Sequence, residues 1–544
     1  MPKTTKAKKQ TKKSQNQDAQ DEQGKPKLHV SDVVEAVTEF AILFRDQNND
    51  PFIAPNGDGT KIYRIGGRNR DFRAWLGSFI RNKFHVVFST GGIDSVAQAL
   101  ESIALDTECS NQYPLELRTV WRDKNDDADP ELYYDLGESA VRITPKGRFL
   151  TARPEIMFRR FSQQLPQVIP GDGGNILELA KYVNLSDRND ILLFLVFAVS
   201  AFIPGYPRPL CLLYGSQGAG KSTPGRLLKR LIDPTSVEGT ALPTSHEDFV
   251  RTANHHALLV FDNLSSIKPN ISDALARIAT GDTFSKRALY TDDDDIVYRL
   301  QRPVMLNGIN QVITQSDLLD RSILLEMHRI DKAKMRTEKD FWADFDEQKP
   351  LILGAIFDTI SKAMAKFPEI HLKELPRMAD FAKWGYAIAD SIDGYTGEDF
   401  LLAYSANIAK QHEQAIESSP VGTAVYLFMT RDDEAKNGWK GTATQLMDKL
   451  ENYHFNDPET NLAKDLRTLT NGNLWPKDPS WFMRRLNYVL PDLESQGIHI
   501  ETYCKKNQRI IKIKNLNYLK EHPGIIPFYQ TELAKKPKKH FDPC

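Results

Sequence analysis

Eight consecutive residues, Gly215 to Ser222, have the types and spacing of a phosphate-binding loop. They read Gly-Ser-Gln-Gly-Ala-Gly-Lys-Ser, a full match to the pattern G-x-x-x-x-G-K-[ST]. The glycines let backbone N–H groups close around phosphate oxygens. Lys221 would contact the β- and γ-phosphates, and the Ser222 hydroxyl would ligate Mg²⁺. The alternative is a glycine turn followed by an incidental Lys-Ser. The pattern predicts ATP and Mg²⁺ as ligands, held by Gly215, Ser216, Gln217, Gly218, Ala219, Gly220, Lys221, Ser222 and Thr223.

A second chemical position lies about forty residues further on. The run Ala-Leu-Leu-Val-Phe ends in Asp262, the form of a Walker B strand whose carboxylate holds Mg²⁺. A strand that happens to end in Asp is the alternative. The next residue is Asn263, where many ATPases of this type have Glu. An amide can orient water but cannot accept its proton. The identity of the general base is therefore left open.

Two weaker signals follow in order. Asn307 comes directly after the apolar residues Val304 to Leu306, and Arg321 precedes the apolar run Ile323 to Leu325. A strand-end Asn can contact the γ-phosphate or the attacking water, and an Arg at such a point can act as an arginine finger on a neighbouring subunit. Taken alone, the Asn is usually a turn residue and the Arg is usually solvated. We interpret the run Asp292 to Asp295 as a solvated loop.

The elements around the loop fit this chemistry. Leu210 to Tyr214 is an apolar run of strand length, and Arg226 to Ile232 has a helical pattern, so the loop joins a strand to a helix. Pro224-Gly225 lies in the first helical turn, where a missing N–H costs little. The 13-residue apolar run Ile191 to Ile203 is too short to span a bilayer and predicts a buried helix.

The C-terminal part has the order of a winged helix. Helical patterns are followed by two strand-like stretches joined by a short turn, and the basic side chains there are candidates for DNA contact. A domain that only packs on the ATPase is the alternative. The predicted helices are Val421–Thr430, Thr442–Leu450 and Ser480–Ser495, the strands are Ile498–Tyr503 and Arg509–Ile513, and the basic candidates are Arg484, Arg485, Lys505, Lys506 and Arg509.

Composition divides the 544 residues into several regions. Strand-like stretches at Phe84–Phe88, Glu116–Trp121 and Leu132–Asp135, with a helical pattern at Ser95–Leu105, indicate a mixed α+β domain without a catalytic constellation. Amphipathic helices are expected over Leu351–Phe367 and Met378–Ile392. The expected regions are a disordered basic tail over 1–28, the α+β domain over 29–185, an α/β P-loop core over 186–330, a helical segment over 331–417, the winged helix over 418–516 and a tail over 517–544.

Overall composition is that of a globular protein. The formal net charge is −1, so local clusters must carry any contact with nucleic acid. The four cysteines, Cys109, Cys211, Cys504 and Cys544, have neither metal-type nor disulfide-type spacing, which suits a reducing compartment. No signal peptide is visible and no membrane is expected, so we expect the protein in the cytoplasm of a bacterial or phage-infected cell.

The ordered motifs resemble the superfamily 3 helicase branch of the AAA+ ATPases, and more closely the phage and mobile-element ATPases related to poxvirus-type primase–helicases. The matching stretches are Tyr-Asp-Leu-Gly (134–137), Phe-Asp-Asn-Leu-Ser-Ser (261–266), Leu-Tyr-Thr-Asp-Asp (289–293), Arg-Pro-Val-Met-Leu-Asn-Gly-Ile (302–309) and Pro-Arg-Met-Ala-Asp-Phe-Ala (376–382).

The resemblance implies an AAA+ core that forms a homo-hexameric ring, with ATP bound between subunits and a DNA strand or fork as substrate. It makes Asn307 a sensor and Arg321 the arginine finger. It places Lys286 and Arg287 on or near a hairpin that grips DNA. Residues 29–185 show no primase site, so a separate primase or other replication factors would act with the chain.

Three functions stay open from the sequence. The leading one is an ATP-driven DNA helicase or translocase in replication of a phage, plasmid or other mobile element. The second is an ATP-gated DNA-binding switch with little processive unwinding, favoured by Asn263. The third is a small-molecule kinase, for which no acceptor pocket is evident.

Overall fold

The computed structural model describes residues 28–522, apart from short segments at 56–60, 68, 109–110, 123–128, 153–155, 288–294, 309–311, 314, 332–334, 454–459 and 506–507. Contacts divide the chain into two compact units. The first unit comprises Met1–Glu116 with Arg153–Arg159, and the second comprises Leu117–Ala152 with Arg160–Cys544. The tail predicted over residues 1–28 lies almost entirely outside the described residues.

The first unit packs three helices against a small mixed sheet of order β3-β2-β1-β4. Buried residues such as Phe72 and Leu76 on one helix and Val96 and Leu100 on another form its core. Its elements are α1 (Val30–Phe40), β1 (Ala41–Arg45), β2 (Pro51–Pro55), β3 (Tyr63–Arg64), α2 (Arg70–Phe84), α3 (Thr90–Leu105) and β4 (Asn111–Gln112).

The predicted helix Ser95–Leu105 is confirmed within α3, but the strand predicted over Phe84–Phe88 is wrong. Helix α2 continues to Phe84, and the residues after it lead directly into α3. Val87 is 81% exposed and forms no ladder. An apolar alternation predicts a strand only where a partner strand is available, and here none pairs with the segment.

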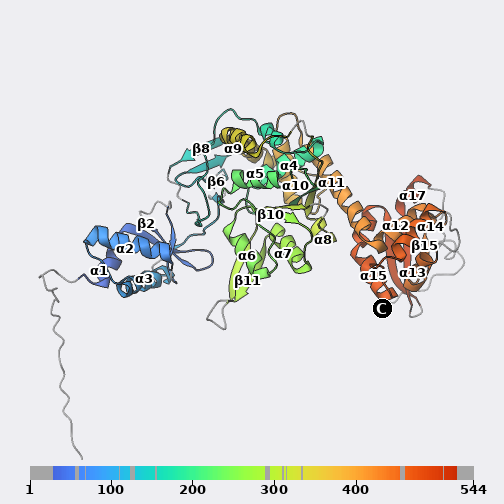
Figure 1. Ribbon diagram of the computed structural model, residues 1–544, viewed down its shortest axis with the longest axis horizontal. Coiled ribbons are helices and arrows are strands. Elements are labelled where there is room, and N and C mark those ends of the chain that lie inside the picture. Colours follow the sequence, from blue (N-terminus) through green and yellow to red (C-terminus); the bar gives the residue numbers. More distant parts are fainter. Residues whose placement is uncertain are drawn as a thin grey trace, which may run out of the picture. The chain divides into compact units, whose positions relative to one another are not determined.

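A four-stranded parallel sheet forms the centre of the second unit (Figure 1). The strand order is β10-β13-β9-β14, and each neighbouring pair is parallel. The strands are β9 (Leu210–Gly215), β10 (Leu259–Leu264), β13 (Val304–Gly308) and β14 (Ser322–Met327). They confirm the strands predicted before the phosphate loop, before Asp262 and before Asn307, and the apolar run Ile323 to Leu325 lies within β14. Because strands that run parallel end at the same edge, their polar end residues converge.

Helices cover both faces of this sheet, which explains why its strands are continuously apolar. One hydrophobic cluster joins Cys211 and Leu213 to α4, α5, α9 and α10, while a second joins Leu210 and Leu212 to α6 and α7. The predicted buried helix is confirmed as α4, in which every residue from Leu192 to Ser200 is buried. The helices are α4 (Arg188–Ser200), α5 (Ser222–Ile232), α6 (His246–His255), α7 (Pro269–Thr280), α8 (Ser316–Leu319), α9 (Glu338–Lys366), α10 (Ala379–Ala389) and α11 (Gly397–Ser418), with short 3₁₀ turns at Ile176–Tyr182 and Phe367–Glu369.

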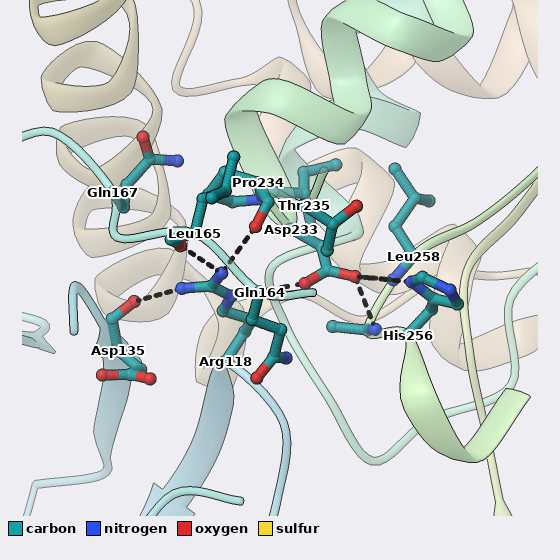
Figure 2. A network of polar contacts seen from close by, with 12 residues as sticks. Arg118, Asp135, Gln164, Leu165, Gln167, Asp233, Pro234, Thr235, His256 and Leu258 are labelled. Atoms are coloured by element: carbon teal, nitrogen blue, oxygen red, sulfur yellow. Dashed lines mark hydrogen bonds and ion pairs between the residues drawn. The ribbon is translucent and has the colours of Figure 1, made fainter. Parts of the chain in front are cut away.

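An antiparallel sheet of order β5-β6-β7-β8 belongs to this second unit, so the region expected as one domain over residues 29–185 is divided between the two units. Buried Arg118 supplies the physical reason (Figure 2). Its guanidinium lies 3.3 Å from Asp233 and donates to the carbonyls of Leu165 and Pro234 at 2.6 and 2.8 Å. The sheet strands are β5 (Thr119–Arg122), β6 (Glu131–Asp135), β7 (Ala140–Thr144) and β8 (Gly147–Thr151).

Asp233 lies at the other end of that network and connects helix α5 to Arg118. Lys229 of α5 donates to its carboxylate at 2.7 Å, and the N–H of Ala257 donates at 2.9 Å. Burial alone would raise the pKa of Asp233, but Lys229, His256 and Arg118 together hold it well below its usual range. The carboxylate therefore stays charged, and its removal would leave two buried cations uncompensated.

Residues 420–522, here called the C-terminal region, have their own core built around Phe428, Leu446, Phe482 and Ile511. Their sheet has the order β15-β17-β16 and is antiparallel throughout. The elements are α12 (Pro420–Arg431), a 3₁₀ turn (Ala435–Asn437), β15 (Trp439–Gly441), α13 (Ala443–Glu451), α14 (Asn461–Thr470), α15 (Pro479–Tyr488), α16 (Leu490–Ser495), β16 (Ile498–Lys505), β17 (Gln508–Asn515) and α17 (Leu516–Glu521).

Two predicted helices and both strands of this region are confirmed, whereas the single helix predicted over Ser480–Ser495 is wrong. The structure has two helices, because Pro491 lacks an N–H and cannot continue α15, and it instead begins α16. The sequence reading also omitted α14 and the short edge strand β15.

Candidate nucleotide-binding site

The phosphate-loop residues connect the end of β9 to the start of α5, as predicted. Three glycines adopt positive φ, +148° at Gly215, +81° at Gly218 and +77° at Gly220. A Cβ at Gly215 would lie 2.0 Å from the carbonyl oxygen of Met327, so no other residue fits there. Of the remaining loop residues, Ala219 is buried, Ser216, Gln217 and Ser222 are exposed, and Lys221 and Thr223 are half-buried.

Lys221 closes the loop upon itself. Its Nζ donates to the carbonyl oxygens of Gly215 and Ser216 at 2.9 and 2.8 Å. These oxygens occupy the positions around the ammonium that phosphate oxygens would take. The lysine is therefore held directly over the loop, and nucleotide binding requires only an exchange of acceptors.

Gly225 explains the unusual Pro-Gly pair inside the helix. A Cβ at Gly225 would lie 2.7 Å from Cγ1 of Val260, a distance that side chains do not tolerate. Glycine thus lets α5 approach β10 closely, while Pro224 occupies the first turn, where its missing N–H costs nothing. The close approach brings the start of α5 next to the end of β10.

That approach joins the two predicted metal ligands. The Oγ of Ser222 donates to Oδ1 of Asp262 at 2.9 Å. A hydroxyl and a carboxylate so placed, beside a loop that binds phosphate, are the hard oxygen donors that Mg²⁺ uses, either directly or through water. The residues present therefore fit Mg²⁺, which Ser222 and Asp262 would hold.

Asn307 connects the two motifs through their backbones. Its Oδ1 accepts from the N–H of Asn263 at 2.7 Å, and its Nδ2 donates to the carbonyl of Lys221 at 3.3 Å. Asn263 has a φ of +59°, and the β10–β13 register shifts between Phe261 and Leu264. This irregularity turns the exposed Asn263 side chain out of the ladder, directly after Asp262.

A cavity of about 580 Å³ adjoins the loop and was not predicted. Gly220 and Thr223 of the loop form one wall, and aromatic side chains form another. Arg226 lies 4.8 Å from the centroid of the Trp342 ring, and it donates to Glu238 at 2.8 Å. The volume and its aromatic lining suit a nucleoside next to the phosphates. Its other walls come from Lys181, Tyr182, Val183, Asn184, Leu185, Ile330, Met335, Arg336, Glu338 and Phe341.

Sequence reasoning missed this cavity because its aromatic residues lie before and after the motifs, separated by more than 100 residues. The only available signal was the cluster of aromatic residues after Lys339, which the sequence alone cannot place beside Tyr182.

Arg321 lies at the end of the sheet where β9 and β14 begin, whereas the loop lies at the end where these strands terminate. The parallel strand β14 pairs Ser322 with Leu210 at its start and Met327 with Gly215 at its end. At about 3.3 Å per residue this separates Arg321 from its own loop by roughly 17–20 Å. The arginine therefore lies too far away to contact a ligand held by the loop of the same chain. Its side chain is 17% exposed and donates to the carbonyl of Asp317 at 2.8 Å.

The predicted DNA contacts lie on the hairpin of β11 (Asp282–Arg287) and β12 (Asp295–Leu300), on helix α15 and on the β16–β17 hairpin. Lys286 and Arg287 end β11, which pairs with β12, and this hairpin extends beyond α6 in Figure 1. In the C-terminal region, Arg484 is exposed and lies 4.9 Å from the Trp481 ring. The other predicted contacts differ: Lys505 and Arg509 are exposed, Arg485 donates to the carbonyl of Leu474, and Lys506 lies outside the described residues.

Two protein-family models match this chain. Residues 176–413 match the model of the actinomycete integrative conjugative element replication protein, and residues 421–524 match the model of the C-terminal domain of the same protein. The two matches are separated only by residues 414–420 and together span well over half of the chain. The chain belongs to this replication-protein family. This RepA family is one of mobile-element proteins, as the sequence resemblance implied, and the matched residues include the whole phosphate-loop site.

No curated protein matches this RepA chain. Two solved structures have a similar backbone trace. One is an apo form of the NrS-1 C-terminal region, at 12% identity and a TM-score of 0.42. The other is the SCCmec type IV Cch, described as an active helicase, at 12% identity and a TM-score of 0.45. The first match covers 89% of this chain and 98% of that one, and the second covers 88% and 95%. Similarity at this level carries no conclusion about function, which must be argued from the residues of the site. Among the described residues, no helix is both long and apolar enough to cross a membrane.

Proposed function

We propose that this RepA-family chain is an ATP-driven DNA helicase or translocase of the superfamily 3 type that replicates a mobile element. The observation that carries the proposal is the contact between Ser222 and Asp262 beneath a closed phosphate loop. It is the arrangement that a hydrolytic Mg-ATP site needs, in a chain whose family replicates DNA.

In this proposal the chain's own residues hold and orient the nucleotide. Lys221 leaves its two carbonyl acceptors for the β- and γ-phosphates, and Ser222 and Asp262 hold the ion. Mg²⁺, when bound, neutralises charge on the phosphates. Asn307 fixes the distance between the loop and Asn263, whose amide orients the attacking water.

The position of Arg321 supports sites shared between subunits. An arginine at the edge of the sheet opposite its own loop can act as an arginine finger only on a neighbouring subunit's nucleotide. A closed ring, proposed here as a hexamer, gives every site such a neighbour. The core is then an AAA+ ATPase core.

DNA contact is assigned to two surfaces. The β11–β12 hairpin, which carries Lys286 and Arg287, would grip a strand. The C-terminal region is proposed to be a winged helix, because helices α12, α13 and α15 precede a hairpin in a three-stranded sheet. Exposed Arg484 and Arg509 line one groove of about 620 Å³ there, so they are the better candidates for phosphate contact than Arg485.

ATP turnover tests the proposal. Full-length protein with Mg-ATP and forked DNA should hydrolyse many ATP molecules per subunit, and DNA should raise the rate. Lys221→Ala should abolish hydrolysis. Lys268→Ala, which removes an exposed lysine at the start of α7, should leave it intact. Absence of multiple turnovers in the wild-type protein would exclude a motor.

A second function is favoured by one observation. Asn263 carries an amide where a hydrolytic site needs a base, and its N–H is already bound to Asn307. An ATP-gated switch that assembles on DNA would need binding without rapid hydrolysis. If each subunit retains one ATP and the affinity for DNA depends on ATP, the switch is favoured over the motor.

A further inference from the structure

A chain of charged side chains begins at Arg321. Its guanidinium contacts the carboxylate of Asp317, and Arg377 contacts that same carboxylate through Nη2 at 2.8 Å. The second nitrogen of Arg377 donates to Asp320 at 2.6 Å. One arginine from the segment before α10 thus contacts two carboxylates, Asp317 and Asp320, that precede Arg321 in the sequence.

The chain continues into the C-terminal region. His412 of α11 lies 4.0 Å from Asp320, and its Nδ1 is 2.8 Å from Oδ1 of Asp492 in α16. Asp492 is 1% exposed, so this contact is made in the interior, where α16 packs against α11. Five contacts between side chains therefore connect the proposed arginine finger to the core of the C-terminal region.

The burial and charges indicate that the chain orients Arg321. The Nε of Arg321 is buried without a hydrogen-bond partner, so the group depends on its contacts with Asp317. Burial tends to raise the pKa of Asp317, but hydrogen bonds from Arg321 and Arg377 lower it below its usual range. The carboxylate is thus charged and held from both sides, which fixes the direction in which the Arg321 guanidinium points.

The same side chains could be considered a cation site, because Asp320, His412 and Asp492 offer ligand atoms within 4.8 Å of one another. Each of the three already has an ionic partner: Arg377 for Asp320, and His412 and Asp492 for each other. Three acids and three basic groups, counting His412 as protonated, balance without an added ion. The ion-pair chain accounts for the cluster.

We propose that Arg377 and Asp317 are positioning residues for Arg321, and that the His412–Asp492 contact makes the position of Arg321 depend on the C-terminal region. DNA that engages the C-terminal region then changes ATP hydrolysis at the neighbouring subunit through α11. This inference rests on the proposed function, since it assumes that Arg321 acts on a neighbour's nucleotide.

A double-mutant cycle on kcat tests the positioning role. Full-length Arg321→Ala should lose about 1,000-fold in kcat with Mg-ATP and DNA. Arg377→Ala should lose about 10-fold in kcat, with ATP affinity unchanged, because the finger acts on the transition state. Arg377→Lys should recover part of that loss. The double variant should be no slower than Arg321→Ala alone, because one residue acts through the other.

The outcomes separate the inference from the proposed function. If Arg321→Ala keeps its kcat, the arginine-finger assignment itself fails. If Arg321→Ala is inactive but Arg377→Ala retains full kcat, or if the two losses multiply, positioning through Arg377 is refuted. Arg431→Ala removes a comparable half-exposed pair, the 2.8 Å contact with Asp465, and should leave kcat unchanged.

The link to the C-terminal region is tested by DNA stimulation. His412→Leu should reduce the ratio of ATPase rates with and without DNA by about fivefold. His412→Gln keeps an N–H donor for Asp492 but removes the positive charge that faces Asp320, and it decides the question if the Leu variant unfolds. A wild-type stimulation ratio in a folded His412→Gln protein would overturn the proposed link.

Discussion

Replacement of Asn307 by Ala isolates the contact that joins the two motifs of the nucleotide site. Asn307 is 3% exposed, and its amide satisfies two backbone groups, the N–H of Asn263 at 2.7 Å and the carbonyl of Lys221 at 3.3 Å. Alanine leaves both groups without that partner and leaves Asn263 in a left-handed conformation with nothing to hold it.

The magnitude follows from those two bonds. A buried polar group that loses its partner costs about 1–3 kcal/mol, so the loss of both bonds should lower the free energy of unfolding of the second unit by about 2–6 kcal/mol. If Asn263 must orient water, kcat should also fall, by about 100-fold, while ATP affinity changes little. Urea denaturation gives the first quantity, and steady-state ATPase assays with an ATP binding titration give the other two.

Asn407 of α11 provides a matched control, because its side chain hydrogen-bonds to the backbone of the same sheet. It is equally buried, and its amide both accepts from and donates to the backbone of Leu324, at 2.9 and 2.7 Å. Asn407→Ala should lose similar stability but keep kcat at a temperature where both variants are folded. If the two variants lose the same fraction of kcat, Asn307 acts only through stability, and its role at the nucleotide is refuted.

Three further outcomes are expected. Gly225→Val should force α5 away from Val260, lowering stability by about 1–3 kcal/mol and weakening ATP binding, as thermal melts and titrations would show; wild-type values would contradict the close approach. Trp342→Ala should raise the ATP dissociation constant by about 2- to 10-fold with inorganic triphosphate binding unchanged, and equal losses for both ligands would exclude a nucleoside in the cavity. The hydrogen bond to Asp492 raises the pKa of His412, so the stability from this pair should be complete below the ordinary imidazole pKa and lost as pH rises through the raised value; melts of wild type and His412→Leu across pH would detect it, and a pH-independent difference would refute it.

The strand, loop and helix of the proposed phosphate site could be predicted from the sequence because the information is local. Gly215 to Ser222 carries its own pattern, and parallel strands bring Asp262 and Asn307 to the same edge whatever the rest of the chain does. The contact between Ser222 and Asp262 follows from the parallel strands and from Gly225, which lets α5 approach β10. The packing role of Gly225 could not be predicted, because it depends on Val260, which is distant in the sequence.

The parts that escaped prediction depend on contacts between distant residues. Arg118, directly before β5, contacts Asp233 directly after α5, so strands expected in the first domain belong to the second unit. The apolar stretch after Phe84 forms no strand because no partner lies beside it. Tyr182 and Trp342 meet at the cavity from positions far apart in the sequence.

Forked-duplex unwinding by the full-length protein tests the central claim most directly. With Mg-ATP, the wild-type protein should separate the strands, and Lys221→Ala should bind the fork without separating it, because the loop then lacks the cation that holds the β- and γ-phosphates. Strand separation by Lys221→Ala at the wild-type rate would contradict a motor driven from this site.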